Sequence, residues 1–418
     1  MPPRLSGRRL GLLRSAPDFR LLFLATLASS IGTWLAFVAL VIDVFDRTES
    51  AAWVSALLVV EFAPLVAIGL LVGPLLDRLP RRNVLVGADV ARAGVFCVLP
   101  FATDSLQIVL LALAAGVATS LFRPAVYAGL PNLVGDEELP RANGLLQSAE
   151  NVTLATGPLL GGILVAWVGP DPAYWFNAAS FAVSAVLILR IRRTLEEGAS
   201  QSEGHWRDLA AGLALVKRSR ALLAVVVVWS IVMVGSAGVS VAEVVLAKRV
   251  FDAGDAGYGL MLATMGLGLV LGGLWAGDWV DHHGARVPYV AAIVVMAVGI
   301  GAAAAAPTVW VAAAVLALAG TGNGVALVCN AVFIQRGVPD RARGRAFTLA
   351  MSASYAALGF GMVGAGPLTD AIGAREVWGV AAGLLAAAAV AALGLTRGLD
   401  LAAAPAAPDR AVASQQGV

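Results

Sequence analysis

The chain has 418 residues, of which 59% are hydrophobic and only 13% are charged, and its formal net charge is +2. A soluble domain carries about 25% charged residues, so this composition excludes an ordinary soluble domain and predicts a membrane protein. The basic runs flank apolar segments and have no nucleic-acid motif beside them, so we expect no nucleic-acid partner.

Apolar segments long enough to cross a bilayer recur along the whole chain. About 20 apolar residues are enough for one crossing, and we expect about twelve crossings. Backbone polar groups in lipid must be satisfied within the segment, so each span is predicted to be a helix and the fold to be an all-α integral membrane fold. The predicted spans are 21–45, 53–76, 83–102, 105–130, 142–168, 172–191, 221–247, 257–280, 287–305, 308–334, 344–372 and 376–396.

One sizeable polar stretch, 192–220, divides the spans into two groups of six. Its apolar residues recur at helical spacing, which predicts an amphipathic helix on the membrane surface. The Ala- and Pro-rich end of the chain is typical of disorder. The expected organisation is an N-terminal cytoplasmic segment (1–20), a six-helix bundle (21–191), a cytoplasmic linker (192–220), a second six-helix bundle (221–397) and a disordered cytoplasmic tail (398–418).

The arginines indicate how the chain is oriented in the membrane. They gather before the first span, between spans 2 and 3, between the two groups of spans, and between spans 10 and 11. If the chain starts in the cytoplasm, all of these segments face the cytoplasm, which is the positive-inside pattern. We therefore expect a multi-pass protein of the cytoplasmic membrane with both termini inside. The run 21–44 is too long for a signal-peptide core and is expected to remain as the first span.

A motif of the loop between spans 2 and 3 returns between spans 8 and 9. Gly73, Asp77 and Arg82 in the first copy match Gly277, Asp281 and Arg286 in the second, and each pair is 204 residues apart. The same interval separates Asp136 from Asp340 and Arg141 from Arg345. Matched charged residues are improbable by chance in a chain with so few charges. The sequence therefore predicts an internal duplication of two related halves.

With two six-helix halves and Gly-x-x-x-Asp-Arg-x-Pro-Arg-Arg over residues 73–82, the chain resembles the major facilitator superfamily. The Gly-Pro-Leu-Leu-Gly-Gly run at 157–162 is similar to an element of drug-exporting antiporters, and 122–125 with 139–143 is similar to the siderophore and macrolide exporters. The resemblance implies two pseudo-symmetric bundles. It also implies secondary active export of a small organic molecule by alternating access, coupled to protons.

The repeated motif is expected to work as a conformational latch on the cytoplasmic side. Gly73 lets two helices approach closely. The Asp77 carboxylate is expected to face the N-terminus of span 11, an interaction of roughly 0.3–2 kcal/mol. The arginines are expected to pair with acids at 136–138; the alternative is a basic loop that only sets topology. The latch residues are Gly73, Asp77, Arg78, Arg81, Arg82, Gly277, Asp281 and Arg286.

The antiporter-type element lies in span 5. Pro158 removes one helix hydrogen bond and favours a kink. Gly157, Gly161 and Gly162 leave a flat surface on which another helix can pack closely. The element therefore predicts a tight contact between the halves that shapes the outer gate. Generic packing of small residues is the alternative.

Carboxylates inside a membrane are expensive and usually functional. Glu61 in span 2 and Glu243 in span 7 have no evident local partner, so they are the candidate proton or substrate carboxylates. Asp89 and Arg92 are three residues apart on one helix and are expected to neutralise each other, and Arg123 is expected to pair with Glu150.

In this fold the first helix of each three-helix repeat lines the central cavity, which here implies spans 1, 4, 7 and 10. Their few polar and aromatic side chains suit a lipophilic neutral or cationic solute, although aromatic residues also anchor helices at the membrane interface. Relatives carry an arginine in span 4 where this chain has Ala112, so their proton route does not transfer. The candidate lining residues are Trp34, Phe37, Phe122, Trp229, Met233, Asn323 and Asn330.

No cofactor and no metal site are expected. Cys97 and Cys329 lie in opposite halves, and no nucleophile elbow or phosphate loop is present, so an enzyme is disfavoured. The expected partners are a small-molecule substrate, protons and the lipid bilayer, and the protein is expected to be monomeric. An uptake permease or lipid flippase of the same fold, or a membrane scaffold without transport activity, remains an alternative.

Overall fold

A computed structural model describes residues 11–71, 79–195, 216, 219–339 and 342–399. In this part of the chain twelve long helices form two bundles, and there is no strand, so the predicted all-α fold is confirmed. Eleven of these helices are long and apolar enough to cross a membrane, and α3 adds an apolar stretch over Ala51–Leu65. The chain is therefore a multi-pass membrane protein.

Six long helices belong to each bundle in the described part of the chain, and they follow one another along the sequence. The first bundle contains α2 (Pro17–Thr48), α3 (Ala51–Leu71), α5 (Arg81–Val98), α6 (Ser105–Gly129), α7 (Leu139–Val168) and α8 (Asp171–Leu189). The second contains α10 (Arg220–Val245), α11 (Gly254–His283), α12 (Arg286–Ala304), α13 (Val309–Gly337), α14 (Arg343–Ile372) and α15 (Ala374–Leu395). Short helical turns follow three of them: η1 (Leu99–Phe101), η2 (Leu130–Asn132) and η3 (Leu246–Val250).

Most helices extend beyond the apolar segments that predicted them. The α2 helix begins at Pro17, where proline suits a first helical turn, and residues 11–15 are helical as well. The helix therefore begins four residues before the span expected from residue 21, because the apolar pattern does not record a polar first turn. Nearly all of the linker and of the C-terminal tail lies outside the described residues, so the amphipathic helix stays a prediction.

The two bundles share one register. Each helix of the second bundle begins within one residue of the position 204 after its counterpart. The clearest pair is α7, over Leu139–Val168, and α14, over Arg343–Ile372, which have the same length. The interval first seen in the loop motifs therefore also holds for the helices.

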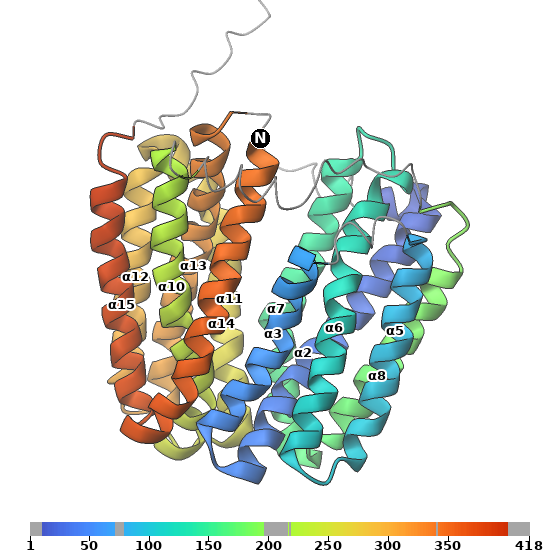
Figure 1. Ribbon diagram of the computed structural model, residues 1–418, viewed down its shortest axis with the longest axis horizontal. Coiled ribbons are helices and arrows are strands. Elements are labelled where there is room, and N and C mark those ends of the chain that lie inside the picture. The colour runs from blue at the N-terminus through green and yellow to red at the C-terminus, as the bar shows by residue number, and fades with distance from the viewer. Residues whose placement is uncertain (1–10, 72–78, 196–215, 217–218, 340–341, 400–418) are drawn as a thin grey trace, which may run out of the picture.

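The bundles lean together at one end and separate toward the other (Figure 1). We call the end with the turns between α2 and α3, α10 and α11, and α14 and α15 the far side, and the opposite end, where α2 begins and α15 ends, the terminus side. Between the bundles, α7 packs on α11 and α3 packs on α14. These two helix pairs close the far side.

Large aromatic side chains stand exposed near the ends of several helices. Trp167 at the end of α7 is 82% exposed, Trp310 at the start of α13 is 73% exposed, and Trp275 in α11 is 66% exposed. Tryptophan rings collect where the hydrocarbon core meets the headgroups. Their exposure fits helices that are surrounded by lipid.

Candidate functional site

A central cavity of about 870 Å³ lies between the bundles. Its two walls differ in chemistry. The first bundle contributes most of the polar side chains, among them Ser29, Thr33, Arg123, Gln147, Glu150 and Asn151. The second contributes mainly apolar ones, Leu269, Val270, Leu274, Leu327 and Val328, together with Tyr355. A solute in this cavity would meet hydrogen-bonding groups on one side and an apolar surface on the other.

The charged pair on the polar wall is Arg123 of α6 with Glu150 of α7. The guanidinium Nη2 lies 2.7 Å from Oε2 of Glu150, which confirms the expected pairing. The hydroxyl of Tyr127 donates to Oε1 of the same carboxylate at 3.3 Å. Glu150 is therefore neutralised, whereas Arg123 remains 55% exposed to the cavity.

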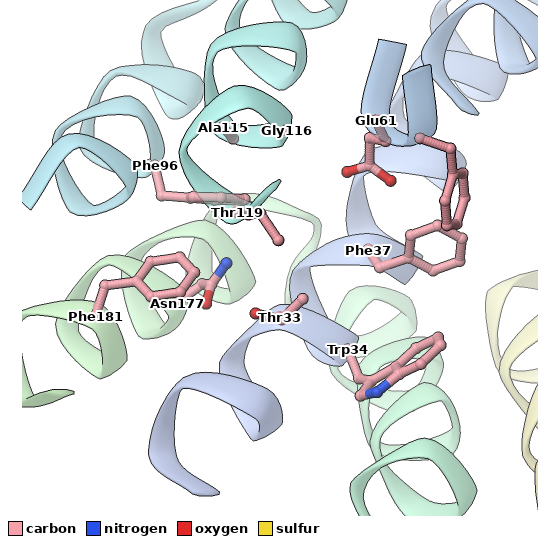
Figure 2. A pocket seen from close by; sticks show the side chains of 11 residues that line it. Thr33, Trp34, Phe37, Glu61, Phe96, Ala115, Gly116, Thr119, Asn177 and Phe181 are labelled. Carbon is pink, nitrogen blue, oxygen red and sulfur yellow. The ribbon is translucent and has the colours of Figure 1, made fainter. Parts of the chain in front are cut away.

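Glu61 of α3 faces a smaller pocket of about 190 Å³ inside the first bundle. Figure 2 shows its carboxylate directed toward the pocket, with the ring of Phe37 below it and that of Trp34 beyond Phe37. These two rings meet edge to face with centroids 5.6 Å apart. Thr119 and the buried Asn177 complete the polar lining. None of the ion pairs among the described residues involves Glu61.

Glu243 of α10 is 2% exposed, and its Oε1 atom has no hydrogen-bond partner within the described part of the chain. Tyr258 of α11 is 1% exposed and lies within electrostatic reach of both Glu243 and Glu61. The two carboxylates that lacked a partner in the sequence thus approach one buried region from opposite bundles. An unpaired carboxylate that is cut off from water is stable mainly in its protonated form.

A second buried acid, Asp89 of α5, behaves differently. It pairs with Arg92 on the same helix, as the spacing predicted, and the two residues are 0% and 3% exposed. The guanidinium lies between the rings of Phe122 and Phe181, 4.3 Å and 4.2 Å from their centroids. This pair joins α5 to α6 and α8, and it borders the central cavity.

The latch motif is only partly visible. Gly73, Asp77 and Arg78 lie outside the described residues, so their expected contact with α14 stays a prediction. Arg81 donates to the carbonyl oxygens of Ala128 and Leu195 at 3.0 Å each.

Arg82 donates to the carbonyl of Ile191 at 2.6 Å and to that of Leu189. The expected pairing of Arg81 and Arg82 with the acids at 136–138 was wrong, because carbonyls at the ends of α6 and α8 lie closer and attract cations.

The second copy of the motif lies at the end of α11. Gly277 faces open space, and Asp281 is exposed in the last turn of the helix. Arg286 begins α12 after a turn through Gly284, whose φ of +71° favours glycine. Nothing in the described contacts assigns a latch role to this copy.

The glycines of the antiporter-type element divide between two partners. A Cβ on Gly162 would lie 2.6 Å from the carbonyl oxygen of Asp255 and 3.0 Å from Cα of Gly259, both on α11 of the other bundle. Gly157 and Gly161 instead face Trp34 and Leu35 of α2 in their own bundle.

The expectation of one tight contact between the halves was therefore wrong for Gly157 and Gly161, which share a different face of α7. Pro158 is buried in the same helix, and its carbonyl oxygen lies against Gly259.

The predicted lining residues divide into two sets. Trp34, Phe37 and Phe122 line the two cavities. Trp229 of α10 belongs to a hydrophobic core cluster that continues through both bundles, and Met233 packs against the same cluster. Asn323 and Asn330 of α13 carry Oδ1 atoms without a partner in the described part of the chain, while Leu327 and Val328 of that helix border the central cavity.

The sequence analysis missed Thr119, Gln147, Asn151 and Asn177. Polar residues on one face of α7, within an otherwise apolar span, were the available signal. No group of described His, Cys, Asp or Glu residues could hold a metal ion.

The profile of a protein family described as "Transmembrane secretion effector" matches residues 13–412. The chain is similar to the "Multidrug efflux pump Tap" of Mycobacterium tuberculosis, with 28% identity over 378 residues that cover 85% of this chain and 88% of that protein. It is also similar to the "Macrolide efflux protein A" of Streptococcus pyogenes, with 22% identity over 268 residues that cover 62% of this chain and 66% of that protein.

Two solved structures have the same fold. A bacterial homologue of the human lysosomal transporter Spinster, in an inward-facing and unoccupied conformation, has a TM-score of 0.76 and 14% identity, with 93% of this chain and 98% of that chain covered. A bacterial homologue of the iron transporter ferroportin, in an inward-facing state, has a TM-score of 0.75 and 14% identity, with 91% and 98% covered.

Proposed function

Because this chain belongs to the transmembrane secretion effector family of major facilitator superfamily transporters, we propose that it exports a small lipophilic molecule by alternating access and couples this export to protons. A transporter of this superfamily moves small molecules across the membrane, and this chain is such a transporter rather than an enzyme. The observation that supports the proposal best is the central cavity, which has one polar and one apolar wall. It lies between bundles whose described helices meet toward the far side and separate toward the terminus side (Figure 1).

The direction of transport rests on the orientation of the chain. The arginine-rich segments favour a terminus side that faces the cytoplasm. In that orientation the bundles separate toward the cytoplasm, so a solute would enter the cavity from inside the cell. The names of the relatives, a multidrug efflux pump and a macrolide efflux protein, agree with export.

The chemistry of the pocket suggests the class of solute. Trp34 and Phe37 offer aromatic surface, and Glu61 offers one negative charge beside them. A lipophilic solute with an amine or another positive group could stack on the rings and neutralise the carboxylate. A strongly anionic solute would find Arg92 and Arg123 in the lining of the larger cavity, and both cations are already paired with carboxylates.

The two unpaired carboxylates support proton coupling. Glu61 borders a pocket of the first bundle, whereas Glu243 is buried in α10, and Tyr258 lies within electrostatic reach of both. When the far side opens, water would reach Glu243, and its proton could exchange with the outside. Solute and proton would then compete for the negative charge of Glu61 on the other side.

The test measures efflux of a fluorescent lipophilic cation from vesicles under an imposed pH gradient. Glu61→Gln and Glu243→Gln keep the shape of the side chain and remove its charge. We expect at least one of them to lower gradient-driven efflux to the rate measured without a gradient. Glu376→Gln, a change at an exposed acid in the first turn of α15, is the matched control and should transport as the parent does.

If both variants keep full gradient-driven efflux, neither carboxylate carries the proton. If the parent accumulates the cation in the opposite direction, the chain imports its substrate.

A further inference from the structure

The far side carries a set of polar contacts between the bundles. Lys248 binds Asp46 of the first bundle and Asp255 of its own bundle, the latter at 2.6 Å. Arg249 donates to the carboxylate of Glu49 at 3.0 Å and to its carbonyl at 2.8 Å. Asp46 is 49% exposed and Glu49 is 80% exposed, so water and salt weaken these ion pairs.

Asp370 makes a contact of another kind. It lies in the last turns of α14, and its carboxylate accepts hydrogen bonds from the backbone N–H of Ala51 at 2.8 Å and of Ala52 at 3.0 Å. The hydroxyl of Ser50 donates to it at 2.7 Å. These donors form the N-terminus of α3, where backbone N–H groups lack partners within the helix and the helix dipole favours a negative charge. A carboxylate of one bundle thus caps a helix of the other.

The first turn of α3 contains no acid, and its local cap is the hydroxyl of Ser50, which accepts from the N–H of Ala52 at 3.2 Å. The counterpart of α3 in the second bundle, α11, carries Asp255 in its first turn, and the position 204 before Asp255 is Ala51. The N-terminus of α11 therefore has a local carboxylate, whereas that of α3 takes its carboxylate from α14. The cap of α3 is complete only while the bundles touch.

Close packing holds Asp370 in this position. A Cβ on Gly366 would lie 2.7 Å from the carbonyl oxygen of Ala51 and would also meet Ser55, so α14 and α3 touch through their backbones. The hydroxyl of Ser55, which is 3% exposed, donates to the carbonyl of Met362 on α14. All of these contacts break together if the far side opens.

The contacts of α3 with α14 and of α7 with α11 that close the far side form what we call the far gate. We propose that Asp370 is a positioning residue of the far gate, and that its carboxylate sets how often the far side opens by capping α3 only in the closed state. Every transport cycle must open this side once. The free energy of the cap therefore contributes to the equilibrium between the far-side-open and the terminus-side-open state. Removal of the charge weakens only the closed state, because the lost contact exists only there. The population in which the far side is open therefore rises.

The experiment measures distances between spin labels in the full-length protein in lipid nanodiscs. Cys97→Ser and Cys329→Ser remove the native thiols. Val98→Cys and Ala302→Cys then place one label on each bundle at the far side. In Asp370→Asn we expect the population with the longer far-side distance to rise by about 2- to 30-fold, the range set by a charge at a helix terminus.

Asp104→Asn is the matched control. Asp104 lies on the same side and caps a helix N-terminus in the same way, because its carboxylate accepts from the N–H of Gln107 at 2.9 Å. That helix is its own α6, so the contact does not cross between the bundles. The control variant should leave the far-side distances as they are in the parent.

Ser50→Asp gives a second, independent readout. It supplies α3 with a local acid at its N-terminus and repels Asp370, so it should raise the far-side-open population as well. In the Ser50→Asp background the further change Asp370→Asn should then add little, because the cap no longer depends on the other bundle. This variant keeps the proposal testable if Asp370→Asn does not fold.

The proposal is wrong if Asp370→Asn and Ser50→Asp both leave the far-side distances unchanged. It is equally wrong if Asp104→Asn shifts them as much as Asp370→Asn does. The measurement needs neither substrate nor a proton gradient, so its outcome is separate from whether the chain exports its solute or uses protons.

Discussion

At the scale of single residues, Arg92 is the most deeply buried cation among the described residues of the first bundle. Its charge is balanced by Asp89, and two aromatic rings cover its guanidinium faces. A cation over an aromatic ring contributes about 0.5–2 kcal/mol. Removal of one partner of a buried ion pair costs about 3–5 kcal/mol, because the other charge stays buried without compensation. Asp89 and Arg92 therefore stabilise the bundle only as a pair.

We predict that Arg92→Met lowers the free energy of unfolding by about 3–5 kcal/mol, because the buried Asp89 then has no cation to pair with. The double change Asp89→Leu with Arg92→Met should recover most of this loss. Denaturation of the detergent-solubilised protein measures both. Equal losses for the single and the double variant would show that the pair does not act as a unit.

Some of these residue contacts could be predicted from the sequence and others could not. The spacing of Asp89 and Arg92 on one helix was enough to pair them. The rings of Phe122 and Phe181 come from distant helices, and no local pattern places them around Arg92. Arg81 was assigned to acids because ion pairs are the simplest expectation for an arginine, whereas carbonyls at helix ends satisfy it in the fold.

At the scale of helices, the α7–α11 contact depends on glycine. Gly162 faces Gly259, and Gly266 of α11 faces the carbonyl oxygen of Leu154 at a distance that leaves no room for a methyl group. Small residues allow helices in a membrane to approach until their backbones touch. This contact, together with that of α3 and α14, closes the far side.

We predict that Gly162→Ala weakens this closure by about 1–3 kcal/mol, the usual cost of overpacking, and shifts the protein toward the far-side-open state. The label pair on Val98→Cys and Ala302→Cys measures the shift. Gly144→Ala on the same helix is the control, since a Cβ on Gly144 meets no atom within 4 Å. If the distance in Gly162→Ala equals that in the parent, α11 shifts locally to accommodate the methyl group and the far side stays closed.

The helices themselves were largely predictable, because apolar runs of about 20 residues leave few other structures possible in lipid. Which face of a helix meets which partner was not. The run at 157–162 contains three glycines, and a single sequence does not distinguish the one that contacts the other bundle from the two that pack on α2. That assignment depends on how the helices are rotated.

At the scale of the whole molecule, the expected terminus-side latch and the far gate use the two ends of the same helix pair. Asp370 of α14 caps α3 on the far side. The sequence predicts that Asp77, beyond the described end of α3, faces the first turn of α14 on the other side. Asp370 would then favour the state in which the far side is closed, and Asp77 the state in which the terminus side is closed.

We predict that Asp77→Asn inserts normally, transports poorly and favours the terminus-side-open state, the opposite of the shift expected for Asp370→Asn. Labels on Asn83→Cys and Val287→Cys report the terminus side, and transport in vesicles with matched protein amounts reports the rate. Wild-type transport together with an unchanged distance would remove the latch role of Asp77.

The far-side contacts have the form of an interface between two copies of one protomer. Gly162 meets Gly259 and Gly366 meets Ser55, and the 204-residue interval converts one contact into the other, as in an isologous dimer. Asp370 breaks this symmetry, because Ala166 stands at the matching position. The contact between α3 and α14 thus includes an exposed charge, whereas the contact between α7 and α11 consists of closely packed backbone. Salt on the far side therefore weakens the contact of α3 with α14 and leaves that of α7 with α11 nearly unchanged.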